Sequence, residues 1–190
     1  MLPPIGPALR LSALTAGVQF VLGTHQPFFP LFLAFRGFDA PSVGLLLAVP
    51  VFVRIVATPV VAALGDRYAA PSRVLMALHL GLFLTYLAML PAGGFWTFLL
   101  LGAIAGALHA GAVPLQDIVL MREIAHQPGL RYGRIRVWGT VSFMTATFVA
   151  GAVVARFTAE SVVVIIALAA LAVAPIAFVQ TCRFDAAPAA

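Results

Sequence analysis

The chain alternates long apolar runs with short polar breaks. Six runs stand out, at 9–33, 42–64, 74–90, 95–121, 135–155 and 161–180. A helix needs about 20 apolar residues to cross the hydrocarbon core of a bilayer. Backbone groups in lipid must also find hydrogen-bond partners within their own segment. The pattern therefore predicts an all-α membrane protein, with six transmembrane helices forming one bundle over residues 1–183 and a loose tail at 184–190.

Composition places this bundle in a lipid bilayer. Hydrophobic residues make up 63% of the chain and charged residues 9%, with a mean hydropathy of +1.09. Soluble domains carry about 25% charged residues, so this chain lacks the polar surface that water requires. The first apolar run is too long for the core of a cleavable signal peptide, and we expect it to remain as the first helix.

The basic residues are distributed as topology signals. All eleven are arginines, in a chain of net charge +5, and their scatter among short loops argues against nucleic acid as a partner. Eight fall at the N-terminus, in the second and fourth loops and in the tail, whereas the first, third and fifth loops hold only Arg36 and Arg156. Because cytoplasmic loops are enriched in Arg, both termini are expected in the cytoplasm, with the protein in a bacterial inner membrane.

Arg54 lies near the middle of the second apolar run. A guanidinium stays charged in proteins, and placing it at mid-bilayer costs roughly 2.5–3.5 kcal/mol on insertion scales. Such residues face a bundle interior or a watery cavity, so Arg54 is predicted to line a solute or proton path. The alternative is a structural arginine paired with carbonyls or a carboxylate, for which Asp117 is one candidate.

Other polar residues mark some helices and leave others bare. The first helix has a stripe of polar side chains, the fourth and fifth helices have several each, and the sixth has almost none. These residues are Ser12, Thr15, Gln19 and Gln26 in the first helix, His109, Gln116 and Asp117 in the fourth, and Trp138, Ser142 and Thr145 in the fifth. The first, second, fourth and fifth helices are therefore predicted to surround a cavity, with the third and sixth outside it.

The individual candidates each have a structural alternative. Asp117 could bind a cation, carry a proton or pair with an arginine, or it could be an interfacial charge in water. His25 beside Gln26 offers donors and acceptors to a solute and can relay protons near neutral pH, unless Pro27 simply kinks the helix at the interface. Trp138 could stack on a ring-bearing solute or mark the membrane interface.

The other three histidines have different interpretations, and one glycine series favours packing. His109 gains weight as a path residue because Gln116 lies on the same helical face, whereas His79 is interpreted as packing and His126 as solvated. Gly102, Gly106 and Ala110 follow a four-residue spacing that allows close helix approach.

Catalytic chemistry finds no support in the sequence. There is no nucleophile elbow, phosphate-binding loop or dinucleotide fingerprint, and no paired metal-ligand histidines. Cys182 is the sole cysteine. The chain is predicted not to be an enzyme and to need no cofactor or metal.

Four stretches carry a family resemblance: Pro27-Phe28-Phe29-Pro30-Leu31-Phe32, Val43-Gly44-Leu45-Leu46-Leu47 leading to Val53-Arg54, Val113-Pro114-Leu115-Gln116-Asp117, and Tyr132-Gly133-Arg134-Ile135-Arg136-Val137-Trp138-Gly139. With them the chain resembles the N-terminal six-helix half of a major facilitator superfamily transporter. The nearest branch is the phenylpropionic-acid transporter-like one, related to the nucleoside and lactose proton symporters. The resemblance implies secondary, proton-coupled transport of a small organic solute, such as an aromatic acid, nucleoside or sugar.

The resemblance also implies roles for particular residues. Asp117 and Arg136 resemble, in order and approximate spacing, a carboxylate and an arginine that contact the solute in the lactose-permease-like relatives. Asp66 and Arg67 match part of the superfamily's gating-loop motif after the second helix. Ala62 and Ala69 stand where that motif has glycines.

The chain is short for this family, whose members have twelve helices in two halves. It is therefore expected to be a truncated product or fragment, or to work with a second six-helix half or as a homodimer. The alternative function is that of a transport-inactive six-helix membrane subunit with an interaction role.

Overall fold

The computed structural model describes residues 6–67, 71–127 and 129–184, and this part of the chain is entirely helical apart from its connections. The helices are α1 (Pro7–Phe35), α2 (Ala40–Arg67), α3 (Pro71–Met89), α4 (Phe95–Ala110), α5 (Ala112–His126), α6 (Tyr132–Arg156) and α7 (Glu160–Phe184). The predicted fold class, an all-α membrane bundle resembling half of a transporter of this superfamily, is confirmed. The expected loose tail lies, apart from Phe184, outside the described residues and stays a prediction.

The helices α4 and α5 together form one membrane-crossing segment, Phe95–His126, with a break at Gly111. Pro114 accounts for the break, because it lacks an N–H and its ring crowds the carbonyl four residues earlier, at Ala110. One apolar run of the sequence is therefore divided into two helices.

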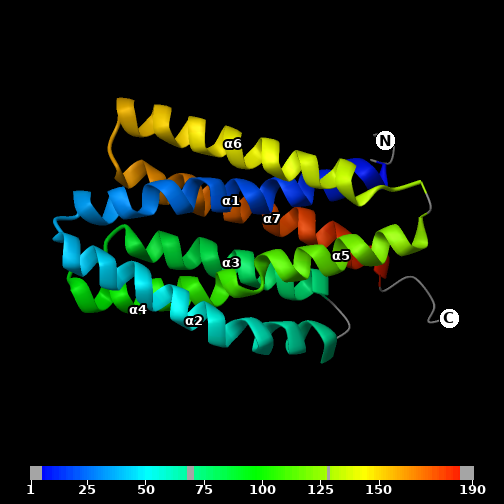
Figure 1. Cartoon of the computed structure of the whole chain (residues 1–190), viewed down its shortest axis with the longest axis horizontal. Coiled ribbons are helices and arrows are strands. Elements are labelled where there is room, and N and C mark those ends of the chain that lie inside the picture. The colour runs from blue at the N-terminus through cyan, green and yellow to red at the C-terminus, as the bar shows by residue number, and fades with distance from the viewer. Residues whose placement is uncertain (1–5, 68–70, 128, 185–190) are drawn as a thin grey trace.

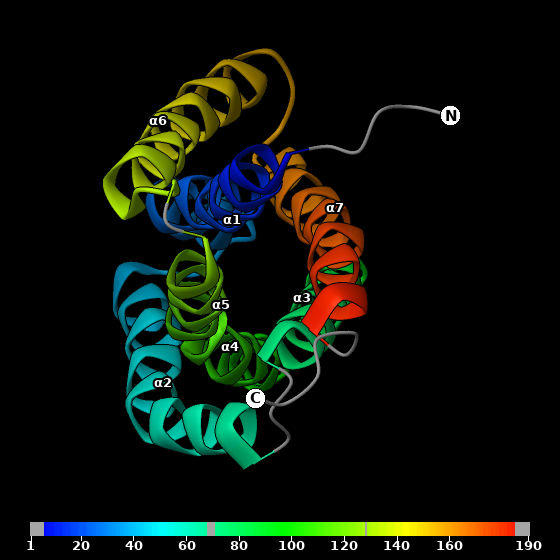
Figure 2. The ribbon, with the colours of Figure 1, turned by 90° about the vertical axis from the view of Figure 1, so that its right-hand side faces the viewer.

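The spans run up and down through an elongated bundle (Figure 1). The start of α1, the α5–α6 connection and the end of α7 lie at one end of the molecule, and the α1–α2, α3–α4 and α6–α7 connections lie at the other. In the end view, α1 occupies the centre of one side, between α6 and α7 (Figure 2). Helix α3 packs against α7, and α2 packs against α4.

Five segments of the described chain are long and apolar enough to cross a membrane: Ala40–Val61, Pro71–Met89, Phe95–His126, Tyr132–Arg156 and Glu160–Gln180. Helix α1 is absent from this set although its 29 residues give a length of roughly 43 Å. Its polar side chains, among them Gln19, His25 and Gln26, lower its hydropathy. This helix lies between α6 and α7, where its polar groups can be shielded from lipid.

Glycines set the closest helix contacts. A Cβ on Gly106 of α4 would lie 2.5 Å from the carbonyl oxygen and 2.8 Å from the Cα of Pro50 in α2. A Cβ on Gly23 of α1 would lie 2.5 Å from the carbonyl oxygen of Phe143 in α6. Backbones approach this closely only where small residues stand at the crossing. The packing role predicted for Gly102 and Gly106 agrees with this arrangement, since both face α2.

Arg36 joins three helices at the end of the bundle opposite the start of α1 and the end of α7 (Figure 1). Its guanidinium donates hydrogen bonds to the carbonyls of Met89, Leu90 and Ala92, after the last turn of α3. It also lies 3.2 Å from a carboxylate oxygen of Glu160, the first residue of α7. Those carbonyls have no intrahelical partner at a helix end, so one side chain satisfies them and joins α1, α3 and α7.

Replacing this guanidinium should lower stability. Arg36→Met keeps the aliphatic stem and loses the hydrogen bonds to a charged donor, which should reduce the free energy of unfolding by about 2–3 kcal/mol. For a chain of this size the loss corresponds to a fall of roughly 5–10 °C in melting temperature, measured on the detergent-solubilised protein. Arg156→Met, at the exposed end of α6, is the matched control and should leave the melting temperature unchanged.

Asp39 begins α2 as a cap. Its Oδ1 accepts a hydrogen bond from the backbone N–H of Ser42 at 3.3 Å. Bonding to Ser42 holds the pKa of the Asp39 carboxyl below its usual value, because a hydrogen bond to the ionised form favours that form.

Candidate functional site

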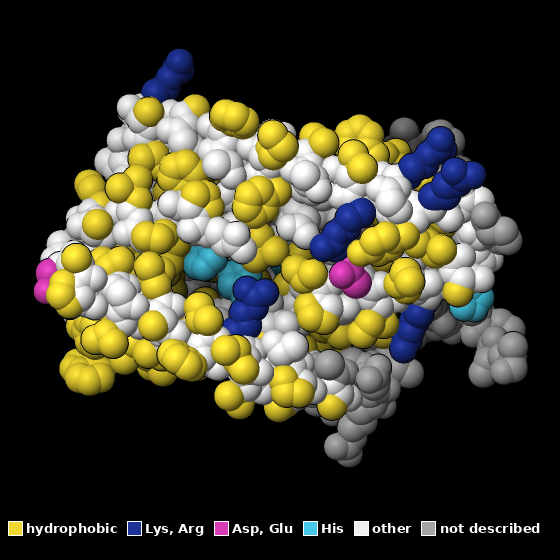
Figure 3. Space-filling view, viewed as in Figure 1, with side chains coloured by type: hydrophobic (Ala, Val, Ile, Leu, Met, Phe, Trp, Pro, Cys, Tyr) yellow, Lys and Arg dark blue, Asp and Glu magenta, His cyan; other side chains and the backbone are white. Residues whose placement is uncertain are grey.

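A cavity of about 280 Å³ lies between α1, α2 and α4. It belongs to the face turned toward the viewer in Figure 1, where histidine and arginine side chains border a hollow near the middle of the molecule (Figure 3). The cavity lies near the middle of the bundle, far from both ends of the helices (Figure 3). This is the level of the hydrocarbon core of a membrane.

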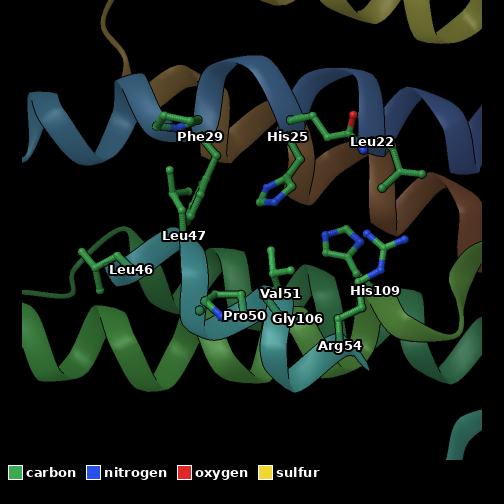
Figure 4. Close-up of a pocket in the computed structure, with 14 residues that line it drawn as sticks. Leu22, His25, Phe29, Leu46, Leu47, Pro50, Val51, Arg54, Gly106 and His109 are labelled. Carbon is green, nitrogen blue, oxygen red and sulfur yellow. The ribbon is translucent and has the colours of Figure 1, made fainter. Parts of the chain in front are cut away.

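The cavity has a polar part and an apolar part. The polar part is formed by His25, Gln26, Arg54 and His109, and the remaining lining is apolar or aromatic: Leu22, Phe29, Pro30, Leu46, Leu47, Pro50, Val51, Gly102, Ala105 and Gly106. In Figure 4 the imidazoles of His25 and His109 approach each other from α1 and α4, and Arg54 extends from α2 beside His109. Phe29, Leu47 and Pro50 lie toward the other end of the cavity.

Within the described part of the chain, the Arg54 guanidinium makes no hydrogen bond or ion pair. Its backbone carbonyl accepts a bond from the Thr58 hydroxyl, as is usual one turn along a helix. The expectation that Asp117 could be its partner is wrong, because Asp117 pairs with Arg136. Arg54 therefore offers five N–H donors to whatever enters the cavity.

Tyr86 of α3 underlies the two histidines. Its hydroxyl oxygen lies 2.8 Å from Nδ1 of His25 and 3.1 Å from Nε2 of His109. The tyrosine is fully buried, whereas His25 is half-buried and reaches the cavity. Sequence reasoning missed this residue by assigning α3 to the outside of the bundle. The available signal was a tyrosine in the middle of an apolar span, because a buried phenol requires a hydrogen-bond partner.

A second polar centre joins α5 to α6. Nη1 of Arg136 lies 2.7 Å from Oδ1 of Asp117, and both side chains are about one-third exposed. The adjacent Gln116 is fully buried and its Nε2 lies 3.5 Å from the hydroxyl oxygen of Thr15 in α1. None of these residues lines the cavity that holds Arg54. The structure thus places the predicted path residues in two groups, and their part in a single path stays a prediction.

The predicted surroundings of the cavity need correction. Helix α6 was expected to line it but packs outside on α1, where Ser142 and Thr147 donate to the carbonyls of Ala16 and Gly23. Of the α6 side chains that had suggested a cavity face, Ser142 is satisfied by α1, and the Thr145 hydroxyl donates to the Val141 carbonyl of its own helix. Gln19 also lies at this contact, against Gly139, and Trp138 is 57% exposed. Helix α3, expected outside, contributes Tyr86 beneath the cavity.

The predicted gating residues end a helix. Asp66 and Arg67 were expected in the turn after the second span. Helix α2 continues past the predicted end of that span, so both residues lie in its last turn. Their side chains lie outside the described part of the structure.

The remaining histidines lie apart from the cavity. His79 is buried and its Nδ1 lies 2.9 Å from the carbonyl of Leu75 in the same helix. His126 is exposed, with Nδ1 2.8 Å from the Arg122 carbonyl. Among the described residues no group of three His, Cys, Asp or Glu side chains is placed to hold a metal ion.

The Asp117–Arg136 pair should contribute modestly to stability. We expect a double-mutant cycle with Asp117→Asn and Arg136→Gln to give a coupling energy of roughly 1 kcal/mol, since both groups are partly exposed. Thermal unfolding of the two single variants and the double variant measures it. Strictly additive effects would show that the contact does not persist in the bilayer.

Comparison with known proteins assigns the class of this fold. Residues 18–189 match the model of the MFS_1 like family. An all-helical bundle with long apolar spans and a polar cavity at mid-depth agrees with that match. The chain is an integral membrane protein and belongs to the MFS_1 like family.

Two curated proteins are similar in sequence to this chain. The chain is 32% identical over 161 residues to the probable 3-phenylpropionic acid transporter of Escherichia coli (strain K12), covering 82% of this chain and 40% of the relative. It is 26% identical over 135 residues to the maltose permease of Geobacillus stearothermophilus, covering 70% of this chain and 34% of the relative. The aligned region thus spans well under half the length of either relative. No solved structure matches.

Proposed function

We propose that this chain supplies the solute-binding half of a secondary transporter that moves a small organic acid together with protons. The observation that carries the proposal is Arg54, a permanent cation without a protein partner in the described residues, at the wall of a mid-span cavity. A charge in that position is costly, and a carboxylate bound beside it would offset the cost.

The cavity favours an acid over a sugar or a nucleoside. Its polar side chains gather in one part, and the rest of the lining is aliphatic or aromatic. A sugar presents hydroxyls on all sides, each needing a partner in a dry site. An arylalkanoic acid presents one anionic group and one apolar body, which match the two parts of the cavity. The similarity to a protein named for 3-phenylpropionic acid points the same way.

In this proposal Arg54 binds the carboxylate, with Gln26, His25 and His109 around it, while Phe29 and Pro50 contact the apolar body. Gln19, Gln116, Trp138 and the Asp117–Arg136 pair act on coupling and movement of the bundle, as do Asp66 and Arg67 at the end of α2. Transport of this kind requires a second six-helix bundle, either a further half or another copy, against which this one tilts.

The arginine distribution further supports placement in a bacterial inner membrane with both termini in the cytoplasm. The helix ends that carry the arginine-rich segments lie at one end of the bundle.

Uptake by cells tests the solute class. Cells producing this chain, alone and with a complementary six-helix half, are given labelled 3-phenylpropionate, maltose or uridine. We expect accumulation of the acid, abolished by a protonophore, and no accumulation of the other two. Accumulation of maltose or uridine would contradict the assignment to acids. A stable complex that binds none of the three would favour a transport-inactive membrane subunit.

A further inference from the structure

We propose that His25, Tyr86 and His109 form a single proton-binding unit, and that the proton it takes up is the one moved with the solute. The proposal rests on the proposed function for its second part and on geometry alone for its first. Three side chains from α1, α3 and α4 meet through two hydrogen bonds to one hydroxyl group.

The hydroxyl of Tyr86 couples the two rings because it has a single proton. It can donate to Nδ1 of His25 or to Nε2 of His109, and it must accept from the other ring. If it donates to His109, then His25 carries its proton on Nδ1 and leaves Nε2 as a free acceptor. If it donates to His25, then His109 carries its proton on Nε2 and leaves Nδ1 as a free acceptor. The protonation site of one ring thus fixes that of the other.

A proton added to this unit can be shared without breaking either contact. It binds the lone pair of Nε2 on His25 and converts that ring to an imidazolium. The Nδ1 proton of His25 then passes to the Tyr86 oxygen as the Tyr86 proton passes to Nε2 of His109. His25 and Tyr86 end neutral, and His109 holds the charge with protons on both nitrogens. No other reactant is needed, and the phenol is neutral before and after.

The two rings lie close together, and one of them reaches the cavity. Nδ1 of His109 is buried with no hydrogen-bond partner, and the ring centroids of His25 and His109 are 5.0 Å apart. His25 lines the cavity and provides the route by which water delivers a proton.

Arg54 connects this unit to the solute. It shares the cavity with both histidines, so its positive charge opposes a second positive charge on the unit. A carboxylate on Arg54 removes that opposition. By linkage, a bound anion favours proton binding and a bound proton favours anion binding to the same extent. That reciprocity is the thermodynamic requirement for moving the two together.

Of the other titratable groups named here on the packed helices, His79 is near enough to act on His109, and the rest lie apart. His79 of α3 is two turns before Tyr86 and bonds to its own helix. On α5 and α6, Asp117 and Arg136 neutralise each other, and on α7 Glu160 is bound to Arg36 at the bundle end. Arg54 is thus the charge that acts on the unit from within its own cavity.

Nitrogen-15 NMR of histidine-labelled protein in nanodiscs tests the first part. The chain has four histidines, and His79→Asn and His126→Gln assign two signals. We expect the His25 and His109 signals to move together at one midpoint as a single proton is taken up. In Tyr86→Phe, which removes one oxygen atom, the common midpoint should split into two, whereas Tyr132→Phe should leave it unchanged. Separate midpoints in the unmodified chain, or a common midpoint in Tyr86→Phe, would overturn the proton unit.

Transport measurements test the second part. Tyr86→Phe should lose at least 10-fold in pH-driven accumulation of 3-phenylpropionate and keep solute exchange across the membrane within 2-fold. Equal losses in both would assign Tyr86 a structural role and refute the coupling. If the unmodified chain moves no solute, the proposed function fails, and the NMR titration still decides whether the proton unit exists.

Discussion

Arg54→Leu should lower uptake of 3-phenylpropionate by roughly 100-fold or more. A carboxylate bound to the Arg54 guanidinium gains charge-assisted hydrogen bonds, and truncating one partner of a charge pair that binding buries costs about 2–5 kcal/mol. At 1.4 kcal/mol per tenfold, 3 kcal/mol corresponds to a factor of more than 100. Initial uptake rates at subsaturating acid, normalised to the amount of protein in the membrane, measure the loss.

The same substitution should leave the fold intact or make it more stable. Arg54 has no protein partner in the described residues, and leucine removes an insertion cost of roughly 2.5–3.5 kcal/mol. Function falling while the melting temperature holds or rises would distinguish a solute ligand from a structural arginine. Arg54→Lys keeps the charge but not the bidentate geometry, and should retain about a tenth of the uptake. Full uptake by Arg54→Leu would remove this residue from the site.

Gly106→Ala should be strongly destabilising although it adds one methyl group. That methyl carbon would lie 2.5 Å from the carbonyl oxygen of Pro50 and 2.8 Å from its Cα. Both are backbone atoms, which cannot rotate away as a side chain can, so α2 and α4 must separate. Overpacking of this kind costs typically 1–3 kcal/mol and occasionally more, and backbone contact places Gly106 at the upper end.

Gly44→Ala provides the matched control. Gly44 lies in α2, near Pro50, and a Cβ there would meet no atom within 4 Å. Alanine is the better helix former by roughly 0.5–1 kcal/mol, so this variant should be unchanged or slightly more stable. Detergent melting curves and the yield of folded protein compare the two. Equal stability of Gly106→Ala and Gly44→Ala would mean that the α2–α4 crossing is looser than described.

Polar residues inside apolar runs were the most useful signal in the sequence. The cost of a buried charge or amide in lipid singles out Arg54, Gln26, His25 and His109 without any knowledge of the fold, and the structure brings these four around one cavity. Their roles stay predictions. The same reasoning could not say which helices would cross, because a polar position on one helix could face any of several neighbouring helices.

The errors follow from that limit. Asp117 was a possible partner of Arg54 from charge alone. In the structure α5 lies beside α6, and Asp117 pairs with Arg136. Ser142 of α6 suggested a cavity lining, but its hydroxyl donates to the Ala16 carbonyl of α1 at a close helix contact. Tyr86 was overlooked because a hydroxyl at the end of an aromatic ring hardly alters the hydropathy of its span. Its importance depends on two histidines that are distant in sequence.

The attachment made by Arg36 limits how this bundle can move. One side chain holds the end of α1, the exit of α3 and the entry of α7 together at the same end of the molecule. Helices fastened at one end resist sliding past each other, so a tilt of the whole bundle meets less resistance than a rearrangement within it. A hinge at the Arg36 end would let the rest of the bundle tilt as one body about the point where α1, α3 and α7 meet.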